Sequence, residues 1–299
     1  MERADRSDRA RFERILDHAP GLSADLAALY GSWPENFVPE ASALRSDLSG
    51  MRIFDAPLFG ISSAADPLYD QLKREGVIGP WHRSPGEWLP GARRVISLFF
   101  PFTEQVRKAQ RAETEEVSPE WLHGRIEGHD AMLVFTARLK DQIEESGYDA
   151  LIPVTEEAFS SVKGGRGIPG YPSMTDRTFG SNWSERHAAY ISGLGMFGLS
   201  GGLITRRGMA GRFCSIITNR LFPVTGRSYA RYDEWCIRCG ACARRCPVEA
   251  ISLESGKDHI RCSAKIDESR IRYAPRYGCG HCQTDVPCED RRCLREDIR

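Results

Sequence analysis

The sequence has no excess of charge of either sign and no hydrophobic run of about 18 residues, the length that spans a membrane. Lys and Arg number 41, and so do Asp and Glu, which gives a formal net charge of zero. A neutral chain lacks the positive field of a dedicated nucleic-acid-binding protein. The first eight residues contain no apolar signal region. We therefore expect a cytoplasmic protein that does not contact a membrane.

Lysine is scarce, since only 6 of the 41 basic residues are Lys. Arg is the residue of choice for paired hydrogen bonds to phosphate or carboxylate. We nevertheless interpret the excess of Arg as codon bias rather than as Arg chosen for such hydrogen bonds.

Cysteine is almost absent from the first 230 residues, where Cys214 is the single example. The other nine of the ten Cys lie between Cys236 and Cys293. In a chain that we expect to be intracellular, such crowding indicates metal ligands or redox groups rather than disulfides. Cys214 itself has apolar neighbours in an expected strand, so we interpret it as a small buried hydrophobic residue.

The interspersed helix and strand patterns predict an α+β fold, or an α/β fold with a mixed sheet. At 299 residues and 41% hydrophobic, the chain can form one domain of about 200 residues and a smaller one. We place these at residues 1–226 and 227–299, joined by a linker over 223–231. Apolar runs predict strands over residues 95–100, 150–154, 201–205 and 212–218. Helical periodicity predicts helices over residues 8–18, 23–31 with Ser23 as N-cap, 132–143 ended by Gly147, and 183–192.

Four closely spaced cysteines form the most specific motif of the chain. The pattern is Cys236-x2-Cys239-x2-Cys242-x3-Cys246-Pro247. Such a run is typical of iron–sulfur proteins, in which the first three Cys bind one [4Fe–4S] cluster and the fourth binds the other cluster. Zinc sites usually have two separated pairs of ligands, so zinc fits this spacing poorly.

A second cluster needs three further ligands besides Cys246. The sequence offers Cys262, Cys279 and Cys282 for it. The first cluster then lacks one ligand, and we expect Cys288 to supply it. Two inserted residues before Cys288 leave Cys293 open as the alternative.

A glycine string, Gly193-Leu-Gly195-Met-Phe-Gly198, matches the spacing of dinucleotide-binding loops. Those loops follow a strand and open a helix, whose N-terminus holds the pyrophosphate. Here a helix is expected before the string and a strand after it, so we reject that interpretation. The glycines still indicate that the backbone approaches something closely, either a packed neighbour or a flat cofactor. The preceding loop, residues 160–184, is long enough to be functional.

Over roughly residues 50–290, these elements together resemble the epoxyqueuosine reductases and the related reductive dehalogenases. The resemblance is carried by Glu185-Arg186, the glycine string, Leu203-Ile-Thr205, the 213–218 strand and the cysteine pattern. It implies a nitroreductase-like domain that binds cobalamin, followed by a small ferredoxin-type domain with two [4Fe–4S] clusters. It also implies that the corrinoid lies against Gly193, Leu194, Gly195, Gly198, Leu203, Ile204 and Thr205.

The chain departs from this pattern where the epoxyqueuosine reductases carry an acidic residue in the central helix. Gly128 occupies that position, and Glu127, His129 and Asp130 flank it. We regard these three as candidate proton donors, with Tyr171 and Tyr190 as less central candidates. The Gly-Lys-Asn that usually follows the glycine element is also absent. These losses lead us not to expect tRNA as a substrate.

The sequence therefore favours an oxidoreductase in which two [4Fe–4S] clusters pass electrons to a corrinoid that reduces a small organic substrate. A low-potential donor such as a flavodoxin or ferredoxin would supply the electrons. Two alternatives remain open: an electron-transfer protein without a corrinoid, and a flavin-dependent reductase.

Overall fold

The structure is a computed structural model that describes residues 20–163 and 179–293. The expected helix over residues 8–18, Tyr171 and most of the 160–184 loop lie outside the described residues.

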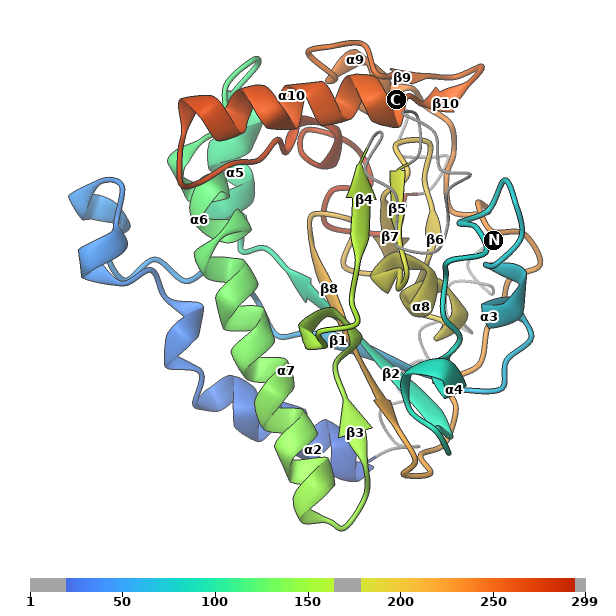
Figure 1. Cartoon of the computed structure of the whole chain (residues 1–299). Coiled ribbons are helices and arrows are strands. Elements are labelled where there is room, and N and C mark those ends of the chain that lie inside the picture. Colours follow the sequence, from blue (N-terminus) through green and yellow to red (C-terminus); the bar gives the residue numbers. More distant parts are fainter. Residues whose placement is uncertain (1–19, 164–178, 294–299) are drawn as a thin grey trace, which may run out of the picture.

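A four-stranded sheet forms the centre of the fold (Figure 1). Its strands lie in the order β1-β2-β8-β3 and are all antiparallel. The α+β expectation is confirmed, but the strands of this sheet are not mixed in direction. The bounds are Leu58–Ser63 for β1, Arg94–Pro101 for β2, Gly211–Thr218 for β8 and Ala150–Leu151 for β3. Of the four expected strands, the one over 150–154 is shorter than predicted because a 3-10 turn, η4 (Pro153–Thr155), follows it.

Both faces of the sheet are buried, which explains the uninterrupted apolar run of β2. Side chains alternate between the faces of a strand. Ile96, Leu98 and Phe100 lie in the larger hydrophobic core, whereas Val95 and Phe99 belong to two smaller ones.

Helices α7 (Glu127–Glu145) and α8 (Glu185–Ile191) both pack on the sheet, each contacting β8. The face of α7 that carries Met132, Phe135 and Leu139 is buried in the larger core, as its periodicity predicted. The helix ends near Gly147, whose φ of 85° favours glycine. One smaller core contains Trp183, just before α8, and Ile191, the last residue of α8.

The expected N-cap of the helix over 23–31 is wrong. Helix α2 spans Pro20–Gly31, so Ser23 lies inside its first turn. Pro is well tolerated there because the first N–H groups of a helix need no partner within it. The remaining elements of this part are α3 (Leu68–Gln71), α4 (Pro85–Trp88), α5 (Glu104–Ala112), α6 (Pro119–Arg125), β4 (Ser161–Lys163), β5 (Phe179–Ser181) and three 3-10 turns, η1 (Pro34–Asn36), η2 (Glu40–Ser42) and η3 (Ser46–Leu48).

The glycine string lies in a hairpin that follows α8. Strand β6 (Gly195–Phe197) pairs antiparallel with β7 (Leu203–Thr205). The order is therefore helix, glycines, strand, as the sequence predicted, and it differs from the order of a dinucleotide-binding loop.

The C-terminal part contains more regular structure than its sequence indicated. Helix α10 (His259–Arg272) has 14 residues and begins at Asp258, whose side chain accepts the amide of Arg261. In Figure 1 it runs across the end of the molecule where α5 and α6 lie. The other elements are α9 (Ala241–Arg244), β9 (Ile251–Ser252), β10 (Gly256–Lys257) and η5 (His281–Gln283).

The expected linker over residues 223–231 has no helix or strand but is held by the body of the protein. The Thr225 amide donates to the Ile61 carbonyl at 2.9 Å, and Arg227 pairs with Asp66 at 2.6 Å. The boundary between residues 226 and 227 stays a prediction. Across the described ranges, no helix combines the length and apolarity that crossing a membrane requires.

Candidate functional site

The first group of cysteines lines a pocket between the C-terminal part and the glycine hairpin. Ile204 and Met209, on or beside β7, form its apolar wall together with Ala241 and Val286. Leu199 donates its amide to the Cys236 sulfur at 3.3 Å, a contact that favours a thiolate. The cysteines of this pocket are Cys236, Cys239, Cys242, Cys288 and Cys293. Because both Cys288 and Cys293 line it, the identity of the fourth ligand remains open.

The second group of cysteines comes from three separate segments. Cys246 follows α9, Cys262 lies on α10, and Cys279 and Cys282 flank and enter η5. The pKa of Cys279 is raised to about 12, mainly by burial and also by the nearby Cys282, Cys262 and Cys246. The amide of Ala250 donates to the Cys246 sulfur at 3.2 Å. These four are the residues that the spacing assigned to the second cluster.

The donor chemistry of both groups fits [4Fe–4S] clusters. Thiolates are the ligands of such clusters. Several thiolates in apolar surroundings are strongly unfavourable unless a bound metal neutralises them, which couples metal binding to folding. No three or more Cys, His, Asp or Glu side chains of the described residues gather as a site for a metal ion. The ligand assignment itself stays a prediction.

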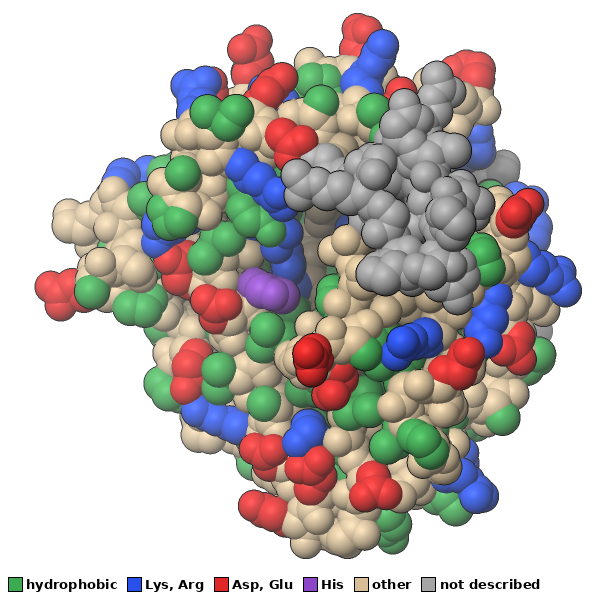
Figure 2. All heavy atoms as spheres, viewed as in Figure 1, with side chains coloured by type: hydrophobic (Ala, Val, Ile, Leu, Met, Phe, Trp, Pro, Cys, Tyr) green, Lys and Arg blue, Asp and Glu red, His purple; other side chains and the backbone are tan. Residues whose placement is uncertain are grey.

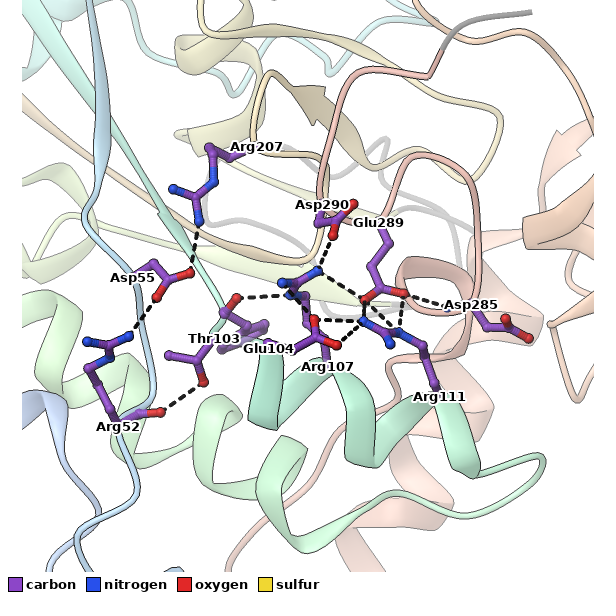
Figure 3. Close-up of polar contacts among 11 residues, drawn as sticks. Arg52, Asp55, Thr103, Glu104, Arg107, Arg111, Arg207, Asp285, Glu289 and Asp290 are labelled. Carbon is purple, nitrogen blue, oxygen red and sulfur yellow. Dashed lines mark hydrogen bonds and ion pairs between the residues drawn. The ribbon is translucent and has the colours of Figure 1, made fainter. Parts of the chain in front are cut away.

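A buried carboxylate holds the loop that carries Cys288 (Figure 3). The Glu289 side chain accepts hydrogen bonds from Arg111 Nε at 2.9 and 3.0 Å and from Arg107 at 3.2 Å. Its backbone carbonyl accepts the Ala210 amide at 3.0 Å. Helix α5 and the start of β8 therefore fix the residue next to Cys288. Sequence reasoning missed this network, because it joins residues 178 to 182 positions apart.

The glycines of the hairpin have a packing reason. A Cβ on Gly195 would lie 2.2 Å from the Ile204 carbonyl oxygen across the β6–β7 pair. Gly193 has a φ of 78°, and a Cβ there would lie 2.3 Å from the Gly226 oxygen. The close approach predicted from the sequence is therefore an approach of the chain to itself.

The side chains expected to contact a corrinoid are turned into the protein. Leu194, Leu203, Ile204 and Thr205 are each at most 2% exposed. Gly198 lines the first cysteine pocket. These residues do not fit a corrin as contact side chains, and their assignment to a cofactor stays a prediction.

Two of the three candidate proton donors are poorly suited to the role. Glu127 is bound by His123 and Arg276. Although burial alone would raise its pKa, the hydrogen bonds with His123 and Arg276 lower it below its ordinary value, so Glu127 is ionised at neutral pH. Asp130 is exposed on the first turn of α7. A carboxylate at this position interacts favourably with the positive end of the helix dipole.

His129 is half-buried and paired with Arg212 of β8. The two atoms, Arg212 Nη2 and His129 Nδ1, lie 3.2 Å apart. A guanidinium can only donate, so Nδ1 accepts and Nε2 carries the hydrogen. Burial lowers the pKa of His129 to about 4, helped by Arg212 and Arg125. The ring is therefore neutral at pH 7 and offers an N–H.

An arginine cluster surrounds this pair. We define it as Arg125 at the end of α6, Arg186 on α8 and Arg212 on β8. Burial is the largest cause of a lowered pKa for each, and it brings that of Arg212 to about 9. Figure 2 shows a hollow beside α6 and α7 in which Lys or Arg side chains lie, with a His at its edge. Nothing in the local sequence signals this cluster, because its members come from three distant elements.

Tyr277 closes the arginine cluster on the side of α10. Arg125 donates to its hydroxyl at 2.8 Å and lies 4.4 Å from its ring centroid. Arg270 lies over the same ring at 4.3 Å. The segment between α10 and the second cysteine group thus forms part of the hollow. Tyr190, a further candidate, instead packs against Phe197 and Tyr229.

Glu185, named above only as part of the resemblance, is a buried acid in the structure. Neither of its carboxylate oxygens has a partner within hydrogen-bond distance among the described residues. Burial raises its pKa to about 7, partly offset by Ser215. It is the neighbour of Arg186 and faces β8.

Residues 230–252 match the family model described as 4Fe-4S binding domain. This segment contains the four-cysteine run. Among curated proteins, none matches this chain.

Solved structures with a similar arrangement include two epoxyqueuosine reductases. One, in complex with an epoxyqueuosine-modified tRNA stem loop, is 20% identical with a TM-score of 0.48, over 82% of this chain and 64% of that one. The enzyme from Streptococcus thermophilus is 18% identical with a TM-score of 0.46, over 78% of this chain and 62% of that one. A reductive dehalogenase, whose description refers to B12-dependent dehalogenation, is 15% identical with a TM-score of 0.48. The match covers 80% of this chain and 31% of that one. This chain therefore spans less than two thirds of these proteins.

Proposed function

We propose that this protein is an iron–sulfur oxidoreductase with two [4Fe–4S] clusters. The observation that carries the proposal is that five cysteines line one pocket, while Cys246, Cys262 and Cys282 lie near enough to Cys279 to raise its pKa. The match of residues 230–252 to the 4Fe-4S binding domain supports it independently.

The finer proposal is that the clusters serve a cobalamin-dependent reduction of a small organic substrate, with a flavodoxin or ferredoxin as donor. It rests on the resemblance of the sequence, since the hairpin side chains do not offer a corrin contact surface. When bound, the clusters pass single electrons and the corrinoid supplies a strongly reducing cobalt centre.

The residues of the hollow would position the substrate and supply a hydrogen bond to it. Arg212 fixes the His129 tautomer with the hydrogen on Nε2. A neutral imidazole can donate that hydrogen to developing negative charge without first being protonated. Glu185 lies outside this arrangement, buried against Ser215, and burial raises its pKa to about 7.

A specific observation favours the alternative of an electron-transfer protein without a corrinoid. Gly193 and Gly195 are required by contacts within the chain, so the glycine string does not need a cofactor to explain it. In that case the C-terminal part would exchange electrons with a partner protein.

The visible spectrum separates these functions. We would purify the protein anaerobically, reconstitute the clusters, and add cobalamin or flavin in separate samples. A cobalamin spectrum that changes on binding and on reduction through the clusters supports the corrinoid reductase. Retention of flavin alone indicates a flavin-dependent reductase, and retention of neither indicates electron transfer. Stoichiometric zinc without labile sulfide would refute the iron–sulfur proposal itself.

A further inference from the structure

We propose that the arginine cluster binds an oxyanion, a carboxylate or a phosphate, carried by the substrate. This proposal rests on the proposed function, because it assumes that the bound molecule is the substrate that the protein reduces. It concerns which chemical class of molecule enters the hollow.

The cluster concentrates positive charge that no described acidic residue pairs with. Arg125 and Arg186 both act on Arg212 and lower its pKa. No Asp or Glu is among the groups that most affect the three arginines, and none of the described carboxylates forms an ion pair with them. Like charges held together at a buried place are costly unless an anion joins them.

The nearest acidic residues of the surrounding helices are already committed or turned away. Glu127 on α7 is bound by His123 and Arg276. Glu185 on α8 raises the pKa values of Cys214 and Tyr69. Its own pKa is determined mainly by burial and by hydrogen bonds with Ser215. Neither neutralises the cluster.

Among the described residues, few groups occupy the hydrogen-bond donors of the cluster. Within this part of the chain, Arg212 contacts His129 Nδ1, and Arg125 contacts the hydroxyl and the ring face of Tyr277. Arg186 is exposed and makes no hydrogen bond or ion pair with the described residues, although burial by its surroundings lowers its pKa. Figure 2 shows a hollow on this face of the molecule in which Lys or Arg side chains lie.

Guanidinium groups fit planar oxyanions, because two parallel N–H groups match two oxygens. The arrangement would hold the anionic end of a molecule close to the His129 Nε2–H. Arg186 also lies near Cys282 and Cys262 of the second cysteine group. The anion would thus hold the reactive part of the substrate beside the second cluster.

Calorimetric titration of the anaerobic holoprotein tests this inference. The probes are inorganic phosphate and benzoate, with benzyl alcohol as the neutral counterpart of benzoate. We expect at least one anion to bind, benzyl alcohol not to bind, and Arg212→Gln and Arg125→Gln each to weaken binding at least tenfold. Arg186→Gln provides a third variant at an exposed position, should either of these fail to fold.

Arg220→Gln is the matched control, because Arg220 lies two residues beyond the C-terminal end of β8 and stacks on Tyr148 and Phe222, whereas Arg212 lies near the start of that strand. It should bind the anion as the native protein does. Phosphate binding alone indicates phosphorylated substrates, and benzoate binding alone indicates carboxylic acids. If neither anion binds, or if the cluster variants bind as tightly as Arg220→Gln, the inference is overturned. Iron and sulfide analysis of the same samples tests the proposed function separately.

Discussion

At the scale of single residues, His82 shows how burial without a partner affects stability. It is 2% exposed, its ring stacks on Trp183 at 5.8 Å, and neither ring nitrogen has a hydrogen-bond partner among the described residues. Burial lowers its pKa to about 3. An unfolded histidine has a pKa of about 6.5, so the folded protein binds fewer protons than the unfolded chain between these values. Stability is therefore lost as the pH falls from about 6.5 towards 3.

We predict that His82→Phe stabilises the protein by about 1–3 kcal/mol, because it removes the buried unpaired nitrogens while keeping the ring. Thermal unfolding at pH 7.5 and 5.5 should show a higher Tm for the variant, with a larger gain at pH 5.5. An equal gain at both pH values would contradict the titration argument.

The control is His123→Phe, at a buried histidine that does have partners. His123 accepts the Leu44 amide at 3.1 Å and pairs with Glu127 at 3.1 Å. The same substitution there should lower the Tm, since it leaves a backbone N–H and a carboxylate without their partner.

A second residue-scale prediction concerns Glu289. Its side chain and that of Arg107 are 6% and 9% exposed, so Glu289→Gln leaves a buried guanidinium with one charged partner fewer. Breaking a buried ion pair in this way costs about 3–5 kcal/mol. We expect a lower Tm and a loss of iron from the first cluster, because Cys288 directly precedes Glu289.

Asp290→Asn is the matched control for Glu289→Gln. Asp290 pairs with the same Arg107 at 2.8 Å but is 47% exposed, and exposed pairs contribute about 0–1 kcal/mol. Iron content and Tm of this variant should stay close to native. Similar losses in both variants would show that the burial of Glu289 has no special role.

At the scale of elements, the β6–β7 hairpin depends on the small size of Gly195. We predict that Gly195→Ala destabilises the protein by about 1–3 kcal/mol or more, since the added Cβ would overlap the Ile204 carbonyl. Gly86→Ala in α4 is the control, because nothing lies within 4 Å of a Cβ there. Circular dichroism with thermal unfolding measures both. A native Tm for Gly195→Ala would show that the strand pair can relax, and would make that variant a clean probe of cofactor binding.

At the same scale, α7 carries the position at which the chain departs from the epoxyqueuosine reductases. Gly128 is buried, and a Cβ there would lie 3.0 Å from Ile53 and from Phe54. An acidic side chain at this position would meet the hydrophobic core. The packing of α7 therefore favours glycine at this position. The next residue, His129, pairs with Arg212.

At the scale of the whole molecule, the two cysteine groups predict two separable clusters. Native protein should contain about eight irons and eight labile sulfides. Cys239→Ser and Cys279→Ser should each lose the signal of one cluster, and the two variants should lose different ones. Iron and sulfide analysis with electron paramagnetic resonance measures this. Loss of both signals in each single variant would contradict independent clusters.

The whole chain also predicts a negative result with tRNA. Because the sequence resemblance assigns Gly128 to the position of the acidic residue of the epoxyqueuosine reductases, we expect no restoration of queuosine in the tRNA of cells that lack that enzyme. A parallel culture that expresses an epoxyqueuosine reductase is the control. Queuosine in the tRNA of cells expressing this chain would contradict the prediction.

The sequence by itself determined the elements whose signals are local. The apolar run of β2, the periodicity of α7 and the helix–glycine–strand order were all predicted, because backbone preference and burial pattern act over a few residues. The same holds for the four-cysteine run, whose spacing directly reflects how a short loop surrounds a cluster. Cys214 was also predicted correctly, as a fully buried residue of β8.

Only the tertiary structure revealed the features that depend on contacts between distant segments of the chain. Helix α10 was missed because its amphipathic pattern is interrupted by charged residues, and packing on the body of the protein stabilises it. The glycines of the hairpin have their explanation only once Gly226 and Ile204 are placed against them. The arginine cluster is the clearest case: Arg125, Arg186 and Arg212 lie on three elements, and an excess of Arg interpreted as codon bias becomes a local positive field only when the fold brings them together.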